Sequence, residues 1–133
     1  MQRSARHVVK VIGGGAEFDV GRGGKNLLRI KITAEVDGVK SDYTITYGRY
    51  GTNAALGFAV ARADAAGGRE ADAERFSALV KALTGREPRI RRKSEGAIEL
   101  VCGRGHLDGF KRFAEFADVI ARWLEETSRR ARA

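Results

Sequence analysis

The chain has 133 residues, 43% hydrophobic and 32% charged, which fits one folded domain with its own core and excludes an intrinsically disordered protein. The net charge of +8 comes mainly from arginine, a residue that binds phosphate and carboxylate groups in a bidentate way. The single cysteine excludes an intrachain disulfide and a cysteine-based zinc cluster, and no apolar run reaches the length of a membrane span.

The amino-terminal segment predicts short strands separated by glycine turns. Residues 7–12 and 16–20 are rich in Val, Ile and Phe, and three glycines at 13–15 join them. A second glycine-rich stretch follows at 21–25. Its spacing is neither that of a dinucleotide-binding loop nor that of a Walker A loop, and a strand follows it, so we interpret both stretches as turns.

The clearest pattern is a β-hairpin around Asp37-Gly38. Apolar and polar residues alternate over 28–36 and again over 39–47, and Asp-Gly suits a two-residue turn with positive φ at both positions. Pairing outward from the turn places one apolar set on a shared face: Leu28, Ile30, Ile32, Tyr43, Ile45 and Tyr47. A one-residue slip would mix the two faces, so we expect this register to be fixed.

Two helices are predicted next. Thr52 or Asn53 can cap a helix over residues 53–64, whose small side chains would let another helix approach closely. A second helix is predicted over residues 70–84, with Gly85 as its C-terminal stop. Its expected core residues are Phe76, Leu79, Val80 and Leu83.

A basic hairpin follows. Arg89-Ile90-Arg91-Arg92-Lys93 is predicted as a strand that turns at residues 94–96, with Gly96 in the left-handed position, and returns through 97–102. This register pairs Arg91 with Glu99 on the outer face and turns Arg92 toward the core. Alternation then places Arg89, Arg91 and Lys93 on one face of the sheet.

The last helix is predicted over residues 107–126, and its expected core stripe is Leu107, Phe110, Phe113, Ala117, Ile120, Ala121 and Leu124. Phe116 and Trp123 fall on a second flank of that helix, where they could form a partner interface. The sequence therefore predicts an α+β domain over residues 1–127, an antiparallel sheet of hairpins packed against about three helices in the order β-β-β-β-α-α-β-β-α. Residues 128–133 are expected to form a basic, flexible tail.

The basic surface is the leading candidate site. Arg89, Arg91 and Lys93 are predicted to contact nucleic-acid phosphates, helped by Arg29, Lys31, Arg104 and the basic tail. Tyr50 lies in a turn beside Arg49 and is the candidate for stacking on a base. The alternative is a solvated outer strand in which Glu99 neutralises Arg91. No catalytic group, metal site or cofactor is predicted, because the two histidines lack a carboxylate cluster and no serine has a nucleophile context.

Residues 16–47, the turn at Tyr47–Gly51 and residues 97–126 resemble the PaRep group, which are paralogous crenarchaeal proteins. The resemblance implies a hyperthermophilic archaeal source and an association with repeated or mobile genetic elements. No function is established for that group, so no residue takes a role from it.

Residues 59–67 resemble a degenerate LAGLIDADG helix of homing endonucleases. In that family the motif helices pack at a two-fold interface, the sheet binds DNA and the last acidic residue of the motif binds the metal. This chain has Ala66 at that last position and matches only the earlier acid, at Asp64. The resemblance implies a DNA-binding half-domain that has lost cleavage.

Three functions follow from these patterns. The first is a nucleic-acid-binding module of low sequence specificity that contacts DNA or RNA phosphates, in the cytoplasm and without a membrane partner. The second is a homodimerisation or protein-interaction domain that uses helix 53–64 or the flank with Phe116 and Trp123. The third is a magnesium-dependent nuclease that depends on Asp64.

Overall fold

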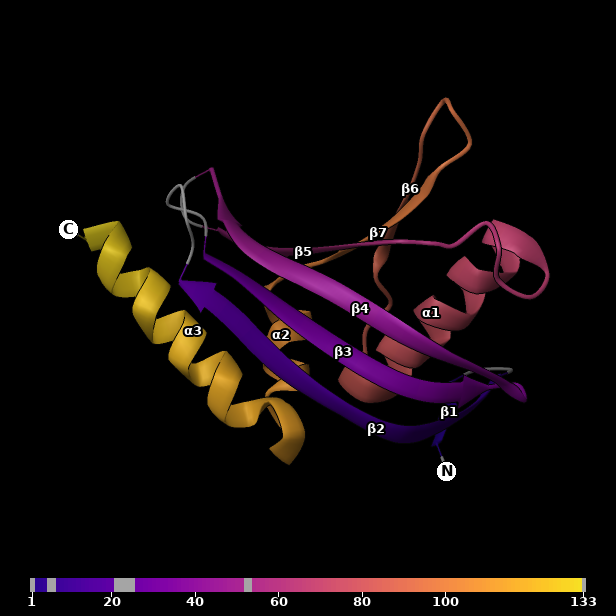
Figure 1. Cartoon of the computed structure of the whole chain (residues 1–133), viewed down its shortest axis with the longest axis horizontal. Coiled ribbons are helices and arrows are strands. Elements are labelled where there is room, and N and C mark those ends of the chain that lie inside the picture. The colour runs from indigo at the N-terminus through magenta and orange to yellow at the C-terminus, as the bar shows by residue number, and fades with distance from the viewer. Residues whose placement is uncertain (1, 5–6, 21–25, 52–53, 133) are drawn as a thin grey trace.

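The computed structural model describes residues 2–4, 7–20, 26–51 and 54–132, and the side chains of 7–18, 26–51 and 54–128. These ranges form one antiparallel sheet with helices packed against it (Figure 1). The strands are β1 (Gln2–Ser4), β2 (His7–Val20), β3 (Asn26–Val36), β4 (Val39–Tyr50), β5 (Ala54–Val60), β6 (Arg89–Arg92) and β7 (Ile98–Cys102). The helices are α1 (Gly68–Thr84), α2 (Arg104–Phe110) and α3 (Ala114–Arg132). The sheet order is β1-β2-β3-β4-β5-β7-β6, so the predicted α+β class is confirmed.

The hairpin of β3 and β4 has the predicted register at every position. Val36 pairs with Val39 next to the turn, and Leu28 pairs with Tyr47 at the far end. Asp37 and Gly38 have φ angles of 51° and 83°, as a two-residue turn of this kind requires. The turn therefore decides which side chains of β3 and β4 face the core.

The core lies between one face of the sheet and the helices. Tyr43 packs edge-on against Phe76 of α1, with ring centroids 4.9 Å apart, and Tyr47 packs edge-on against Trp123 of α3 at 6.3 Å. The Tyr47 hydroxyl also donates a hydrogen bond to the Gly103 carbonyl, at the start of α2. All three helices thus cover the same face of the sheet.

The helix predicted over 53–64 is wrong, because residues 54–60 form strand β5. Its small residues Ala55, Gly57 and Ala59 face the helices, while larger side chains alternate with them on the other face. Gly57 must be small: a Cβ atom there would lie 2.7 Å from the Tyr47 ring. Small residues in this segment fit both a helical and a strand period, and packing against Tyr47 selects the strand. The proposed capping residues at 52 and 53 lie outside the described residues.

The turn predicted at Gly13-Gly14-Gly15 is also wrong, because β2 runs through it with a bulge between Val11 and Gly13. Gly14 faces α3, where a Cβ atom would lie 3.0 Å from the Phe116 ring. Gly14 therefore lets helix α3 approach the strand closely. The second glycine stretch, at 21–25, lies outside the described residues.

Helix α1 confirms the second predicted helix. It buries Phe76, Leu79, Val80 and Leu83 and ends at Gly85, whose φ is 81°. The last predicted helix is instead two helices, α2 and α3, separated at residues 111–113. The α2 segment packs closely on the end of α1, since a Cβ atom at Gly109 would lie 2.7 Å from Thr84. Residues 128–132, expected as a flexible tail, continue α3.

The basic hairpin of β6 and β7 also has the predicted register, with Ile90 opposite Leu100 and Arg91 opposite Glu99. Gly96 has a φ of 93°, as expected for its bulged turn. The hairpin tip projects away from the rest of the sheet (Figure 1). Arg92 faces the helix side, where it forms an ion pair with Glu70 of α1.

The packing of Gly57 under Tyr47 can be tested by Gly57→Ala. The new methyl group would overlap the Tyr47 ring, and overpacking of this kind costs about 1–3 kcal/mol of unfolding free energy. Gly15→Ala is the matched control, because a Cβ atom at Gly15 meets nothing within 4 Å. Urea unfolding followed by circular dichroism measures both, and equal stability of the two variants would contradict the assignment.

Candidate nucleic-acid interface

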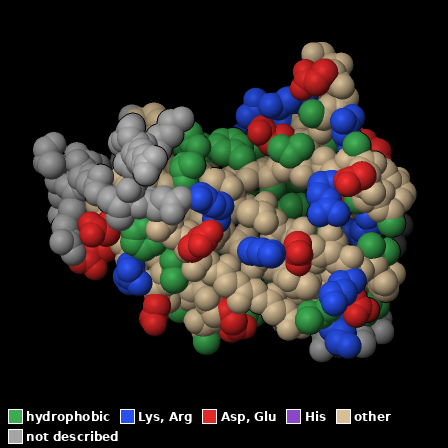
Figure 2. All heavy atoms as spheres, viewed as in Figure 1, with side chains coloured by type: hydrophobic (Ala, Val, Ile, Leu, Met, Phe, Trp, Pro, Cys, Tyr) green, Lys and Arg blue, Asp and Glu red, His purple; other side chains and the backbone are tan. Residues whose placement is uncertain are grey.

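The face of the sheet opposite the helices is open along its described strands. We call it the open face. Figure 2, viewed onto this face, shows basic side chains, with acidic ones beside them, across its middle and on the projecting hairpin, and hydrophobic side chains between these two regions. The exposed side chains of Lys31 and Thr44 belong to this face, because they alternate with the buried residues of β3 and β4.

One row of residues crosses five strands of the open face. Arg29 pairs with Thr46, Thr46 with Phe58, Phe58 with Val101, and Val101 with Arg89. We call this the Phe58 row. It places a basic residue from each predicted hairpin at either end of one line, with an aromatic ring at the centre. The two hairpins therefore contribute to a single surface.

A second set of cations lies beside this row. Lys31 is two residues from Arg29 on β3, and Arg91 is two residues from Arg89 on β6, so both keep the same face. Lys93 follows Arg91 by two residues, just beyond the end of β6. The five residues predicted to bind phosphate on the two hairpins thus share the open face: Arg29, Lys31, Arg89, Arg91 and Lys93.

Tyr50 and Phe58 form an aromatic pair on this face. Their ring centroids are 5.4 Å apart at an interplanar angle of 87°, and 42% of Tyr50 is exposed. Val60, the next outward residue of β5, is 59% exposed. The predicted stacking residue Tyr50 therefore has an aromatic neighbour, Phe58, in the middle of the basic surface.

Carboxylates partly neutralise the cations. Glu99 lies 3.3 Å from Arg91 and 3.9 Å from Lys93, measured between side-chain nitrogen and oxygen atoms. Asp42 lies 3.8 Å from Lys31. The Thr33 hydroxyl donates a 2.6 Å hydrogen bond to Asp42, and this bond lowers the pKa of Asp42 below its usual value.

Arg89 differs from these cations. Across the described residues its side chain makes no hydrogen bond or ion pair, and the residue is exposed. The predicted neutralisation of Arg91 by Glu99 is present, but it leaves Arg89 at the end of the Phe58 row without a carboxylate partner.

A shallow hollow adjoins the row. Its volume is about 570 Å³, and Arg29, Lys31, Thr33 and Thr44 line it together with residues 14–17 of β2. Gly15 leaves open space at this place, because a Cβ atom there would meet nothing within 4 Å. The glycines of β2 therefore make room beside two cations, although they do not form the loop typical of phosphate-binding motifs.

Three predicted site residues lie elsewhere. Arg104 is at the start of α2, on the helix side, and pairs with Asp108 at 3.1 Å. Phe116 and Trp123 are 3% and 0% exposed, so the partner interface predicted for them is wrong. Trp123 instead donates from its ring nitrogen to the Asn26 carbonyl at 3.1 Å.

The helical stripe of α3 explains this error. Its buried residues are Phe116, Ile120, Trp123 and Thr127, a face rotated from the stripe predicted along Phe113, Ile120 and Leu124. Both stripes contain Ile120 and both have helical spacing. The Thr127 hydroxyl donates a 2.7 Å hydrogen bond to the Trp123 carbonyl, which allows this polar side chain to be buried at the end of the stripe. Because Thr127 is polar, the sequence does not show these four residues as one apolar face.

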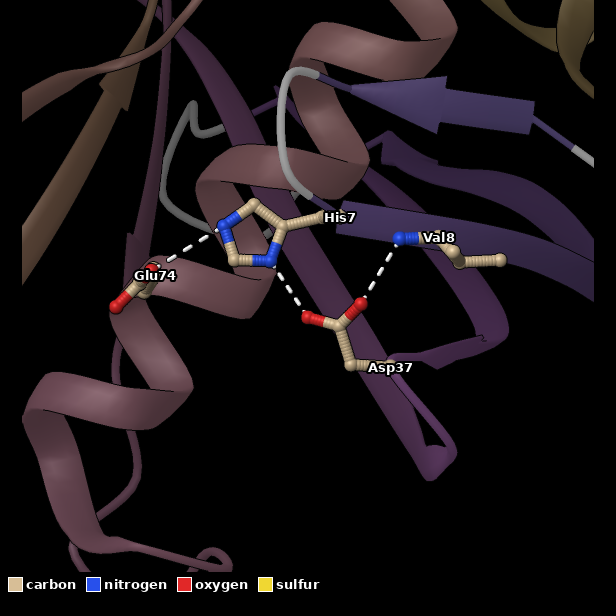
Figure 3. Close-up of polar contacts among 4 residues, drawn as sticks. All are labelled: His7, Val8, Asp37 and Glu74. Carbon is tan, nitrogen blue, oxygen red and sulfur yellow. Dashed lines mark hydrogen bonds and ion pairs between the residues drawn. The ribbon is translucent and has the colours of Figure 1, made fainter.

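A polar cluster at the opposite end of the sheet joins three elements (Figure 3). Nδ1 of His7 lies 2.6 Å from Asp37, and Nε2 lies 3.2 Å from Glu74 of α1. Asp37 also accepts a 2.8 Å hydrogen bond from the Val8 amide. Only the imidazolium form of His7 donates from both nitrogens. These contacts tie the start of β2 to the β3–β4 turn and to α1, so we interpret the cluster as a structural clamp.

The structure offers no support for catalysis at Asp64 or Cys102. Asp64 lies in the turn after β5, outside any helix, and pairs with Arg62 at 3.6 Å, so the predicted LAGLIDADG helix is wrong. Burial raises the pKa of the Cys102 thiol to about 12, which keeps it protonated at neutral pH. Within the described ranges no group of three or more His, Cys, Asp or Glu residues could hold a metal ion.

Comparison with models of known protein families, with curated proteins and with solved structures finds no match. The PaRep and LAGLIDADG resemblances therefore stay predictions. The helix that the LAGLIDADG resemblance implies is not formed by residues 59–67. None of the helices in the described part of the chain is long and apolar enough to cross a membrane.

Sequence reasoning missed Phe58 as a site residue. Because residues 53–64 were predicted to be a helix, Phe58 was not placed on the sheet with the basic residues. The signal that could have found it is the alternation of small residues at 55, 57 and 59 with Leu56, Phe58 and Val60. Read with period two, this pattern is a strand with its large side chains on one face.

The clamp predicts a specific acid sensitivity. The hydrogen bonds from His7 and the Val8 amide hold the pKa of Asp37 below its usual 3.8. Its contribution to stability is therefore present above pH 3.8 and is lost as pH falls through the lower folded-state pKa. Asp37→Asn should flatten this acid loss while tolerating the positive φ of the turn.

Urea midpoints between pH 7 and about pH 2 measure the effect, because the loss occurs below pH 3.8. Asp118→Asn is the control, since Asp118 is an exposed carboxylate on α3. Parallel pH curves for wild type and Asp37→Asn would contradict the role of the clamp.

Proposed function

We propose that the chain is a nucleic-acid-binding module of low sequence specificity and that its open face contacts the phosphates. The observation that carries the proposal is the shared face of Arg29, Lys31, Arg89, Arg91 and Lys93. The net charge of +8 attracts a polyanion over a longer range.

The ion pair between Lys31 and Asp42 on the open face is compatible with phosphate binding. Their side chains are 61% and 51% exposed, and exposed pairs of this kind contribute about 0–1 kcal/mol. A phosphate can therefore compete with Asp42 for Lys31 at little cost. Low specificity follows because phosphate contacts carry no direct sequence information.

The dimerisation alternative loses both elements on which it depended. Residues 54–60 are a strand that pairs with β4 on one side and β7 on the other, and Phe116 and Trp123 of α3 are buried between that helix and the sheet. The nuclease alternative loses the helix that would hold Asp64. Of the three functions, phosphate binding is the one that the described surface supports best.

The experiment is a salt titration by fluorescence anisotropy, with labelled single-stranded and duplex DNA. Wild type should bind at low salt, and log affinity should fall with log salt by about 0.7–0.9 per phosphate contacted. The double variant Arg29→Gln/Arg89→Gln should lose affinity and show a slope smaller by about 0.7–0.9 for each residue removed.

The matched control is Lys111→Gln/Arg112→Gln, which removes the same charge from two exposed residues between α2 and α3. This control should bind nearly as well as wild type. Equal losses in the two double variants would mean that net charge, and not the open face, drives binding. No binding at low salt would rule out the function itself.

A further inference from the structure

We propose that the open face binds single-stranded nucleic acid, with a base stacked on Phe58 and the neighbouring phosphates held by Arg29 and Arg89. This rests on the proposed function and narrows it to one class of ligand. It depends on the aromatic pair and on the distances along the Phe58 row.

The row has the dimensions of a stacking site with cations on both sides. Arg29 and Arg89 each lie two strands from Phe58, so their Cα atoms are each about 10 Å from that of Phe58. The backbone of a stacked nucleotide leaves the base with a phosphate on either side. Long guanidinium side chains at both ends of the row can approach those phosphates while the base covers the ring.

The aromatic pair supplies the stacking surface. The Tyr50 and Phe58 rings are nearly perpendicular, at 87°. Their faces therefore point in different directions, and one ligand can contact both rings. Aromatic rings on a sheet stack on bases regardless of sequence, since every base has a π-face. Exposed Val60 extends the same apolar surface.

A single strand fits this face better than a duplex. The Phe58 row spans four strand intervals, about 19 Å, whereas the major groove is about 12 Å wide and admits a helix or a two-stranded ribbon. A duplex also hides the faces of its bases by stacking them on one another. It could therefore contact the open face through phosphates but not through Phe58.

The projecting hairpin is the part of the fold narrow enough for a groove, but its charges are already engaged. Arg91 and Lys93 pair with Glu99, and Arg92 pairs with Glu70. Its loop also carries the acidic Glu95. The basic residue without a carboxylate partner is Arg89, at the base of the hairpin and in the Phe58 row.

The hollow beside the row gives the sugar–phosphate chain a place to lie. Arg29 and Lys31 line it together with Thr44 and with Glu17, which lies 3.9 Å from Arg29, and its volume is about 570 Å³. A chain leaving a base on Phe58 toward β3 would enter this hollow. The open space at Gly15 is thereby connected to the stacking site.

The test uses three labelled probes at one salt concentration: a 12-residue oligothymidine, the same oligomer with abasic residues, and a 12-base-pair duplex. Wild type should bind the oligothymidine more tightly than the other two. Phe58→Leu should weaken oligothymidine binding about 5- to 100-fold, the range for loss of one stacked base, and leave the duplex and abasic affinities unchanged. Oligouridine should show the same dependence on Phe58.

Two further variants separate stacking from folding. Phe58→Tyr keeps an aromatic ring and should retain the affinity of wild type. Phe113→Leu removes a partly buried ring on the helix side and should also bind normally. Urea unfolding of all variants checks that each is folded at the binding temperature.

The outcomes distinguish the two proposals. Equal affinity of wild type and Phe58→Leu for oligothymidine, or of wild type for the intact and abasic oligomers, would overturn stacking. If Arg29→Gln/Arg89→Gln still weakened binding in that case, the phosphate-binding function would stand. Absence of binding to every probe at low salt would overturn both.

Discussion

The turn at Asp37-Gly38 is the constraint from which the two faces of the sheet follow. It fixes the pairing of β3 with β4, so it decides that Tyr43 and Tyr47 face the helices and that Lys31 faces solvent. The same Asp37 binds His7 and the Val8 amide at the start of β2, and His7 reaches Glu74 of α1. Asp37 therefore links the turn to the start of β2 directly and to α1 through His7.

The packing around Tyr47 in the core also determines which side chains of β5 lie on the open face. The Tyr47 ring covers Gly57, so the inward positions of β5 must be small, as Ala55 and Ala59 also are. The apolar bulk of β5 then lies on its outward positions, which include Phe58. The candidate stacking surface and the tight packing under Tyr47 are thus two sides of one strand. A change that loosened the inner side would also move Phe58.

Local features of the fold were predictable from the sequence, and contacts between distant segments were not. Alternation and turn residues predict the registers of the β3–β4 and β6–β7 hairpins, because each hairpin pairs neighbouring segments of the chain across one short turn. The segment 54–60 was misread as a helix, because Ala and Gly satisfy either period and the Tyr47 ring that decides between them is set by β4. The ion pair between Arg92 and Glu70 depends on where α1 begins, which the hairpin alone does not reveal.

The candidate site shows the same division. Each hairpin predicted which of its cations point outward, but their common face requires the order β4-β5-β7-β6, and that order exists because 54–60 is a strand. Glu99 pairs with both Arg91 and Lys93, and these pairs decide which cations contribute most to phosphate binding. A phosphate that drew Arg91 and Lys93 away would leave Glu99, whose side chain is only 14% exposed, without its partners. Arg89 imposes no such loss, so the centre of binding is expected on the Phe58 row and not at the tip of the basic hairpin.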